Sequence, residues 1–180
     1  MNPRVAKLFR KLQDSHQKLL SELDKTEPKI LETSPEKNKW SVTQVMYHLN
    51  TAESNSVLYV TKKRLGAAQL KRTGIIHQLK LFIAVIAFYL PVKYRAPRVL
   101  GEMPEHVKYS EIKNEWIATR NKLAALLESL PDDELRKPIF RQPFFGYWNI
   151  FQMLWFMQVH FNRHRKQIMK TIKKLETANQ

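Results

Sequence analysis

Two histidines near the C-terminus, His160 and His164, are the residues whose type and spacing point most directly to chemistry. On an α-helix, residues four positions apart lie about 40° from each other around the axis, so both imidazoles share one face. The same face carries apolar residues: Ile150, Met153, Leu154, Met157, Phe161, Ile168 and Ile172. Most basic residues lie on the far side: Arg163, Lys166, Lys170, Lys173 and Lys174. The periodicity therefore predicts that both histidines face the core.

A pair of inward-facing imidazoles needs partners, because an uncompensated polar group in a core costs about 1–3 kcal/mol. Hydrogen bonds satisfy most core histidines, and a metal ion is the alternative. Histidines at i and i+4 supply two ligands, as on zinc-binding helices, and a third must come from another element. His48 is the candidate, because it flanks the apolar stripe of an earlier predicted helix. Three histidines would leave a coordination position open, which is typical of catalytic metal sites.

The other histidines, His16, His77 and His106, have no partner at a useful spacing, and we interpret them as surface or packing residues. The chain has no cysteine, which excludes disulfides and thiolate metal sites. A metal would therefore be bound by nitrogen and oxygen atoms alone. Spacing by itself leaves both a hydrogen-bonded histidine cluster and a metal centre open.

Four amphipathic helices are predicted, and two of them would position these histidines. The helix over residues 41–66 carries His48, and the helix that starts near residue 149 and continues to about residue 175 carries the pair. Both begin at a capping-box pattern, in which a polar residue is followed three positions later by glutamine. The other two helices are predicted over residues 2–24 and 110–130, and the polar stretch 25–39 between the first two helices as a loop.

The connection between the second and third helices, residues 66–109, is too long to be a bare loop in a compact domain. We predict an extra helix over roughly residues 75–90, ended by Pro91, and an extended or irregular segment over residues 93–106. The pattern as a whole predicts an all-α fold, a four-helix bundle with one long crossover, in which residues 1–180 form one domain.

The most apolar run of the chain, LFIAVIAFYLPV, occupies residues 81–92 of this connection. It is shorter than the ~20 residues that a helix needs to span a bilayer, so we do not expect stable membrane insertion. A buried helix is the interpretation that we favour over contact with a membrane surface.

Basic residues exceed acidic ones by 31 to 16, which gives a formal net charge of +15. Such an excess raises nucleic acid, anionic membranes and anionic small molecules as partners. The sequence has no helix-turn-helix, zinc-finger or RNA-binding signature, so nucleic acid is not the partner that we expect. The N-terminus lacks the apolar run of a secretory signal, and the expected location is cytoplasmic.

Two stretches resemble the DinB-like superfamily of four-helix-bundle metalloenzymes. Residues 39–49, KWSVTQVMYHL, are similar to the family's second-helix motif, in which tryptophan and serine precede a helix with His-Leu and, five residues after the histidine, a glutamate. Residues 144–168, FFGYWNIFQMLWFMQVHFNRHRKQI, resemble its glycine turn, helix start and His-x-x-x-His-x-x-Gln-Ile. This resemblance implies a divalent metal ion, usually zinc or nickel, on His48, His160 and His164.

Relatives in this superfamily include metal-dependent hydrolases and transferases that join small thiols to other substrates. The resemblance therefore implies a metal-dependent transferase or hydrolase that acts on a small molecule, thiol-bearing or anionic. A bundle that binds a metal or ligand without turnover is the alternative. Glu53, the glutamate of the motif, would either orient a metal ligand or pair with an arginine in the core.

Two further features stay open at this point. Tyr47 and Tyr147 could donate protons, although aromatic packing is the interpretation that we favour for both. The insertion around residues 75–104 is long and apolar for the superfamily. It could cover the pocket, form the surface of a homodimer or touch a membrane.

Overall fold

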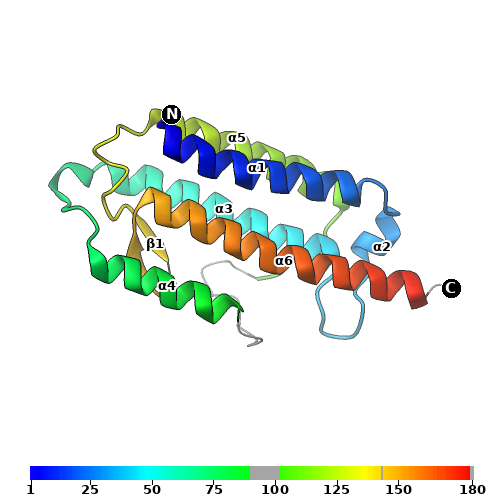
Figure 1. Ribbon diagram of the computed structural model, residues 1–180. Coiled ribbons are helices and arrows are strands. Elements are labelled where there is room, and N and C mark those ends of the chain that lie inside the picture. The colour runs from blue at the N-terminus through cyan, green and yellow to red at the C-terminus, as the bar shows by residue number, and fades with distance from the viewer. Residues whose placement is uncertain (90–101, 143, 179–180) are drawn as a thin grey trace.

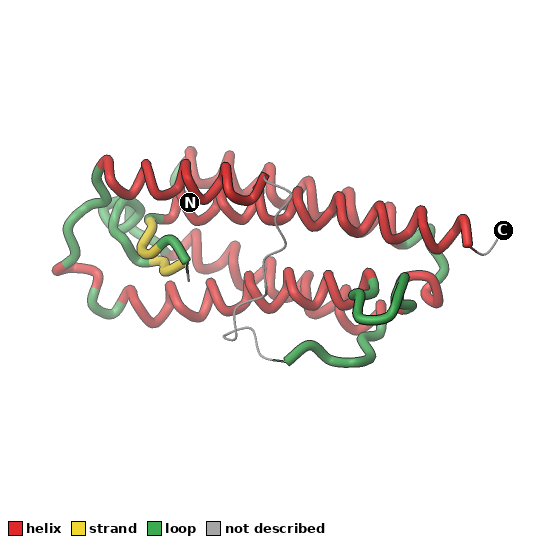
Figure 2. The backbone as a smooth tube through the Cα atoms, turned by 90° about the horizontal axis from the view of Figure 1, so that it is seen from below, coloured by secondary structure: helices red, strands yellow, loops and turns green. Residues whose placement is uncertain are grey.

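Four long helices form a bundle, and Figures 1 and 2 show them side by side along one axis. The computed structural model describes residues 1–89, 102–142 and 144–178. The bundle helices are α1 (Pro3–Leu23), α3 (Val42–Arg64), α5 (Tyr109–Ser129) and α6 (Ile150–Ala178). This architecture confirms the predicted all-α four-helix bundle.

Consecutive bundle helices do not all run antiparallel. The helices α1 and α6 run parallel, and so do α3 and α5. In each pair, the sequence separation between contacting residues stays nearly the same from one contact to the next. The contacts are Ser15–Gln158 and Glu22–Arg165 for the first pair, and Glu53–Arg120 and Arg64–Ser129 for the second. Because α3 and α5 are parallel neighbours, the chain must return along the whole bundle between them (Figure 1). This return is the predicted crossover.

The two helices that carry the histidines begin at the predicted capping boxes. At the start of α3, the Gln44 backbone N–H donates to Ser41 Oγ at 3.1 Å, and the Ser41 N–H donates to Gln44 Oε1 at 2.9 Å. Asn149 and Gln152 form the same reciprocal pair at the start of α6, with both distances 3.0 Å. Each box satisfies two backbone donors that the first helical turn leaves unpaired, and so fixes where the helix begins.

The interior of the bundle anchors both histidine-bearing helices. Leu49 follows His48 and Phe161 follows His160, and both apolar side chains are fully or almost fully buried. Trp116 of α5 lies between the helices, with its ring centroid 6.1 Å from that of Phe161. Burying side chains of this size contributes about 2–3 kcal/mol each, which holds α3 and α6 in register beneath the histidines.

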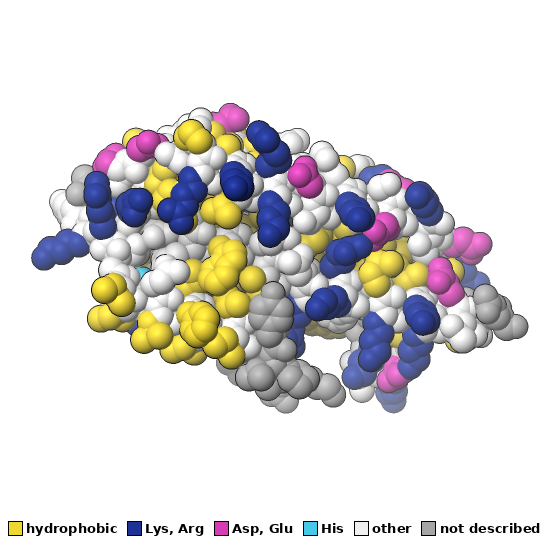
Figure 3. All heavy atoms as spheres, viewed as in Figure 1, with side chains coloured by type: hydrophobic (Ala, Val, Ile, Leu, Met, Phe, Trp, Pro, Cys, Tyr) yellow, Lys and Arg dark blue, Asp and Glu magenta, His cyan; other side chains and the backbone are white. Residues whose placement is uncertain are grey.

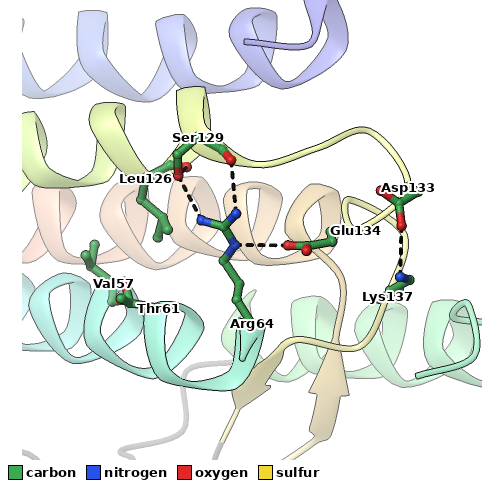
Figure 4. A network of polar contacts seen from close by, with 8 residues as sticks. All are labelled: Val57, Thr61, Arg64, Leu126, Ser129, Asp133, Glu134 and Lys137. Carbon is green, nitrogen blue, oxygen red and sulfur yellow. Dashed lines mark hydrogen bonds and ion pairs between the residues drawn. The ribbon is translucent and has the colours of Figure 1, made fainter. Parts of the chain in front are cut away.

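The end of α3 is tied to the connection that follows α5 (Figure 4). Arg64 donates from Nε to Glu134 at 2.9 Å, from Nη1 to Ser129 Oγ at 2.9 Å and from Nη2 to the Ser129 carbonyl at 3.0 Å. Lys137 and Asp133 form a second ion pair in the same connection, at 2.9 Å. The guanidinium therefore satisfies a carbonyl at the C-terminus of α5 and joins the two parallel helices at one end.

Residues 25–39 were predicted to be a loop. The structure differs, because this stretch includes the short helix α2 (Pro28–Glu32). Pro28 occupies the first turn, where its fixed backbone angle suits a helix and its missing N–H is not needed. Leu31 of this helix is fully buried in the core. A five-residue helix is not stable by itself, so this packing explains its formation.

A two-stranded antiparallel hairpin, β1 (Phe140–Gln142) and β2 (Gly146–Trp148), precedes α6 and was not predicted. Gly146 has a backbone φ of 87°, a conformation that glycine adopts without strain. Gln142 Oε1 accepts hydrogen bonds from the backbone N–H groups of Phe144 and Phe145, both at 2.7 Å. A side chain therefore replaces the backbone partner that would normally close this turn.

The crossover contains a 3₁₀ turn (Ala67–Gln69) and the helix α4 (Ile75–Tyr89), which confirms the predicted extra helix. The prediction of a buried helix is wrong, because α4 lies outside the bundle, mainly against α6 and β2, and only one of its sides is covered (Figure 1). None of the described helices is both long and apolar enough to cross a membrane. Residues 102–106 are irregular, as predicted, whereas Pro91 and residues 93–101 lie outside the described residues.

Candidate metal centre

The three histidines singled out in the sequence lie together where α3 packs against α6. The Nε2 atoms of His48 and His160 are 3.3 Å apart. The ring centroid of His164 lies 4.8 Å from that of His48 and 4.6 Å from that of His160. One ring nitrogen from each histidine lies within 4.8 Å of the other two. The structure therefore brings all three predicted ligands into one cluster.

Two aromatic side chains that the sequence reasoning did not assign to the site border this cluster. The ring of Trp40 lies 5.4 Å from that of His48, and the ring of Phe156 stacks on His160 with centroids 6.0 Å apart and planes only 6° apart. Both had a signal in the sequence. Trp40 directly precedes the Ser41 cap, and Phe156 lies one helical turn before His160 on the same face.

Gln167 determines which nitrogen of His164 carries the proton. Nδ1 of His164 lies 2.9 Å from Oε1 of Gln167. Because an amide oxygen only accepts hydrogen bonds, Nδ1 must be the donor, and in the neutral ring the lone pair is then on Nε2. This is the arrangement in which a partner of one ring nitrogen prepares the other for a metal. Gln167 belongs to the quoted His-x-x-x-His-x-x-Gln-Ile pattern, and its role could have been read there.

All three imidazoles are held in the neutral form. Burial lowers the pKa of His48 to about 4. Burial and the neighbouring His48 lower the pKa of His164 to about 3, although the hydrogen bond with Gln167 acts in the opposite direction. The pKa of His160 lies well below its usual value, first through burial and then through the other two histidines. At neutral pH the cluster therefore offers three uncharged nitrogen donors.

The donor set and its spacing fit a tetrahedral metal ion. Zinc binds imidazole nitrogen at about 2.0–2.1 Å, which places two ligands of a tetrahedron about 3.3–3.4 Å apart. The His48–His160 separation of 3.3 Å has this length. The widest separation in the cluster, up to 4.8 Å, is longer, so binding would draw the rings together. A hydrogen bond between His48 and His160 would satisfy the same two nitrogens, and is the alternative to a metal at this spacing.

Glu53 lies in the core, where α5 holds both of its carboxylate oxygens. Nη2 of Arg120 donates to Oε1 at 2.8 Å, and Nε of the same guanidinium lies 2.7 Å from Oε2. The indole N–H of Trp116 donates to Oε2 at 3.0 Å. Glu53 is thus a buried carboxylate paired with an arginine, one of the two arrangements left open by the sequence, and a role in orienting a metal ligand stays a prediction. Neither Arg120 nor Trp116 had been singled out as its partner, because neither lies near it in sequence.

The remaining histidines are surface or packing residues, as expected. His16 is buried with its ring 4.4 Å from that of Trp116, and His106 is exposed. Nδ1 of His77 accepts a hydrogen bond from the Gly74 backbone N–H, 3.3 Å away, at the start of α4. These three side chains are not part of the cluster formed by the predicted ligands.

The two tyrosines considered as proton donors differ from each other. Tyr47 packs against the core, as expected. Tyr147 lies in β2 and is more exposed than expected, at 44%. The guanidinium of Arg141 lies 5.9 Å from the centre of its ring.

Comparison with protein families gave a match over most of the chain. The model of the DinB superfamily matches residues 6–168, a range that contains His48, His160 and His164. A search of curated proteins gave no match. Because the matched range covers most of the chain, this protein belongs to the DinB superfamily.

Proposed function

We propose that this protein binds a divalent metal ion through His48, His160 and His164 and acts as a metal-dependent transferase or hydrolase on a small molecule. The observation that carries the proposal is the 3.3 Å separation of the His48 and His160 Nε2 atoms, which matches the ligand spacing of a tetrahedral ion. Neutral imidazoles and the hydrogen bond of His164 with Gln167 support it. Zinc and nickel are the ions that we propose, because both bind imidazole nitrogen well.

The bound ion would supply Lewis-acid charge, which makes a water or thiol in its open coordination position more acidic. The protein side chains would prepare the site for it. Trp40 and Phe156 pack against His48 and His160 and limit the number of positions that these rings can occupy. Gln167 holds the proton of His164 on Nδ1. Three neutral ligands leave the charge of the ion uncompensated, so the site would favour anionic substrates, such as thiolates.

Metal binding is tested by isothermal titration of zinc and nickel salts into chelator-treated protein. We expect one ion per chain for the wild type and at least about a hundredfold weaker binding for His160→Ala, because two imidazoles remain. His106→Ala is the matched control, since it removes an exposed histidine outside the cluster. Equal affinity in the wild type and His160→Ala would refute the proposed site.

Turnover is tested separately, on protein loaded with the metal that it binds. Low-molecular-weight thiols are offered together with an electrophilic acceptor, and ester and amide hydrolysis are measured in parallel. Activity that depends on both the metal and His160 would support the proposed enzyme. A metal-binding protein that turns over none of these substrates would favour the alternative, a bundle that binds metal without catalysis.

A further inference from the structure

The helix α4 carries an apolar stripe that the rest of the protein leaves exposed. Six large apolar side chains form it, and between 47% and 88% of the surface of each is exposed. They are Ile75, Ile76, Leu79, Phe82, Ile83 and Ile86. Successive members are one or three positions apart, so they share one side of the helix. In Figure 3, hydrophobic side chains gather in the region where Figure 1 places α4.

This stripe is not the face that packs α4 onto the protein. Leu81, Ala84 and Val85 are buried and occupy the other side of the helix, where α4 meets α6 and β2. A helix at the surface of a soluble domain normally presents polar residues to water opposite its buried face. Here both sides are apolar. A contiguous exposed patch of this kind marks a surface that binds something.

The surroundings of the stripe are basic. Residues 54–89 contain six lysines and arginines and no aspartate or glutamate. Among them Lys71, Arg72 and Lys80 are exposed, just before or within α4. Residues 135–175, which include β2 and the part of α6 that α4 contacts, also lack acidic residues.

The hairpin extends this basic and apolar surface. Lys80 and Arg141 line a shallow depression of about 490 Å³ together with aromatic residues of the hairpin. Of these, Phe144 is 60% exposed. Lys80 of α4 thus lies beside a second cationic side chain and exposed aromatic rings of the hairpin. We call the six stripe residues with Lys71, Arg72 and Lys80 the α4 surface.

We propose that the α4 surface docks onto anionic lipid membranes, with the stripe among the acyl chains and the basic residues at the headgroups. Helices that lie in the membrane interface combine an apolar face with lysine and arginine in this way. Each basic residue near an anionic surface strengthens binding about fivefold. A second copy of the chain is a poorer occupant, because two surfaces with basic residues and no acidic ones would then face and repel each other.

The proposal is tested by flotation of the wild-type protein with vesicles. One set contains phosphatidylcholine alone, and the other contains about 30 mol% phosphatidylglycerol. We expect binding to the anionic vesicles that weakens as salt is raised, and at least about tenfold weaker binding to the neutral ones. Absence of binding to the anionic vesicles at low salt would overturn the proposal.

Matched variants separate the two components of the α4 surface. Ile76→Gln combined with Ile83→Gln should weaken binding to anionic vesicles at least about tenfold, because two large apolar side chains no longer enter the acyl region. Ile117→Gln is the control, since Ile117 is an exposed isoleucine of α5, on a helix outside this surface. Both proteins should keep the wild-type circular dichroism, because the substituted side chains are exposed. Equal vesicle binding by the double variant and the wild type would contradict the proposal.

The electrostatic component is tested by reversal of two charges. Lys71→Glu with Arg72→Glu should weaken binding to anionic vesicles more than Lys170→Glu with Lys173→Glu, which changes the net charge equally on α6. Equal losses would show that net charge alone attracts the protein, and would overturn the assigned surface. Sedimentation velocity addresses the other occupant. A wild-type dimer that the Ile76→Gln and Ile83→Gln pair dissociates, without vesicle binding, would make this surface a contact between copies.

Discussion

Replacement of Glu53 by glutamine should strongly destabilise the protein. Glu53 is 4% exposed and its partner Arg120 only 1% exposed, so both charges are in the core. The carboxylate faces the guanidinium at 2.7 and 2.8 Å and also accepts from the Trp116 indole. Glutamine keeps the size of the side chain and one oxygen acceptor. It removes the negative charge, and therefore leaves Arg120 as a buried cation without its anion.

The expected loss follows from that unpaired charge. Removing one partner of a buried ion pair costs about 3–5 kcal/mol, and glutamine should lie near the lower value because its oxygen still accepts a hydrogen bond. This is a large part of the about 5–15 kcal/mol by which most domains are stable. Replacing both members, with Glu53→Leu and Arg120→Met, should recover most of the loss, because no uncompensated charge remains.

Urea unfolding followed by circular dichroism measures this effect. Glu53→Gln should lower the midpoint by about 1–2 M without a change in slope. Glu111→Gln is the matched control, because Glu111 pairs with Lys108 at side-chain exposures of 63% and 72%, and should change stability by less than about 1 kcal/mol. A loss below about 1 kcal/mol for Glu53→Gln would refute the reasoning on the buried pair.

The same variant decides between the two roles considered for Glu53. If the carboxylate serves the core alone, Glu53→Gln should bind zinc or nickel with nearly the affinity of the wild type under conditions where it is folded. A loss of about 10–100-fold in affinity would instead show that Glu53 orients a ligand of the metal.

Three further predictions follow from individual side chains. Burial and the charge of Arg120 lower the pKa of His16 to about 3, so the folded protein keeps it neutral while the unfolded chain protonates it. The stability that the neutral His16 contributes is complete above about pH 6.5 and is lost as pH falls toward the folded-state pKa, because the unfolded chain then binds a proton that the folded protein does not. This lowers the free energy of unfolding by about 2 kcal/mol near pH 5. His16→Leu should remove that loss, as measured by urea unfolding at the two pH values. Gln167→Ala should weaken zinc binding about 10–100-fold in calorimetry, because His164 loses the partner of its Nδ1 proton; unchanged affinity would contradict that role. Ser41→Ala should cost about 1 kcal/mol in thermal unfolding through loss of the α3 cap, and a negligible change would count against it.

The features predicted correctly from the sequence depend on local patterns. Ser41 and Asn149 mark helix starts because a cap acts on the backbone only two or three residues away. Helical periodicity placed His160 and His164 on the apolar side of α6 because one helix fixes their relative direction. His48 required more, since nothing in its own helix specifies α6 as the neighbour. The structure brings the three together, and metal binding by them stays a prediction.

The errors and omissions depend on contacts between distant segments. The short helix α2 forms because Leu31 reaches the core, and its five residues are too few for a helical pattern. The hairpin has strands of three residues, too short for an alternating pattern, and the side chain of Gln142 closes its turn. The run within α4 is apolar on both sides, and a single sequence does not show which side the protein covers. Arg120, which decides the environment of Glu53, lies on another helix.

The most direct test of the proposed metal centre is a crystal structure of zinc-loaded protein with anomalous diffraction recorded on both sides of the zinc absorption edge. We predict one anomalous peak among the three rings, with Nε2 of His48 and His160 and one nitrogen of His164 each at about 2.0–2.1 Å. Absence of a peak at this position, with an intact hydrogen bond between His48 and His160, would contradict the proposed centre. The cluster would then be a hydrogen-bonded group of core histidines.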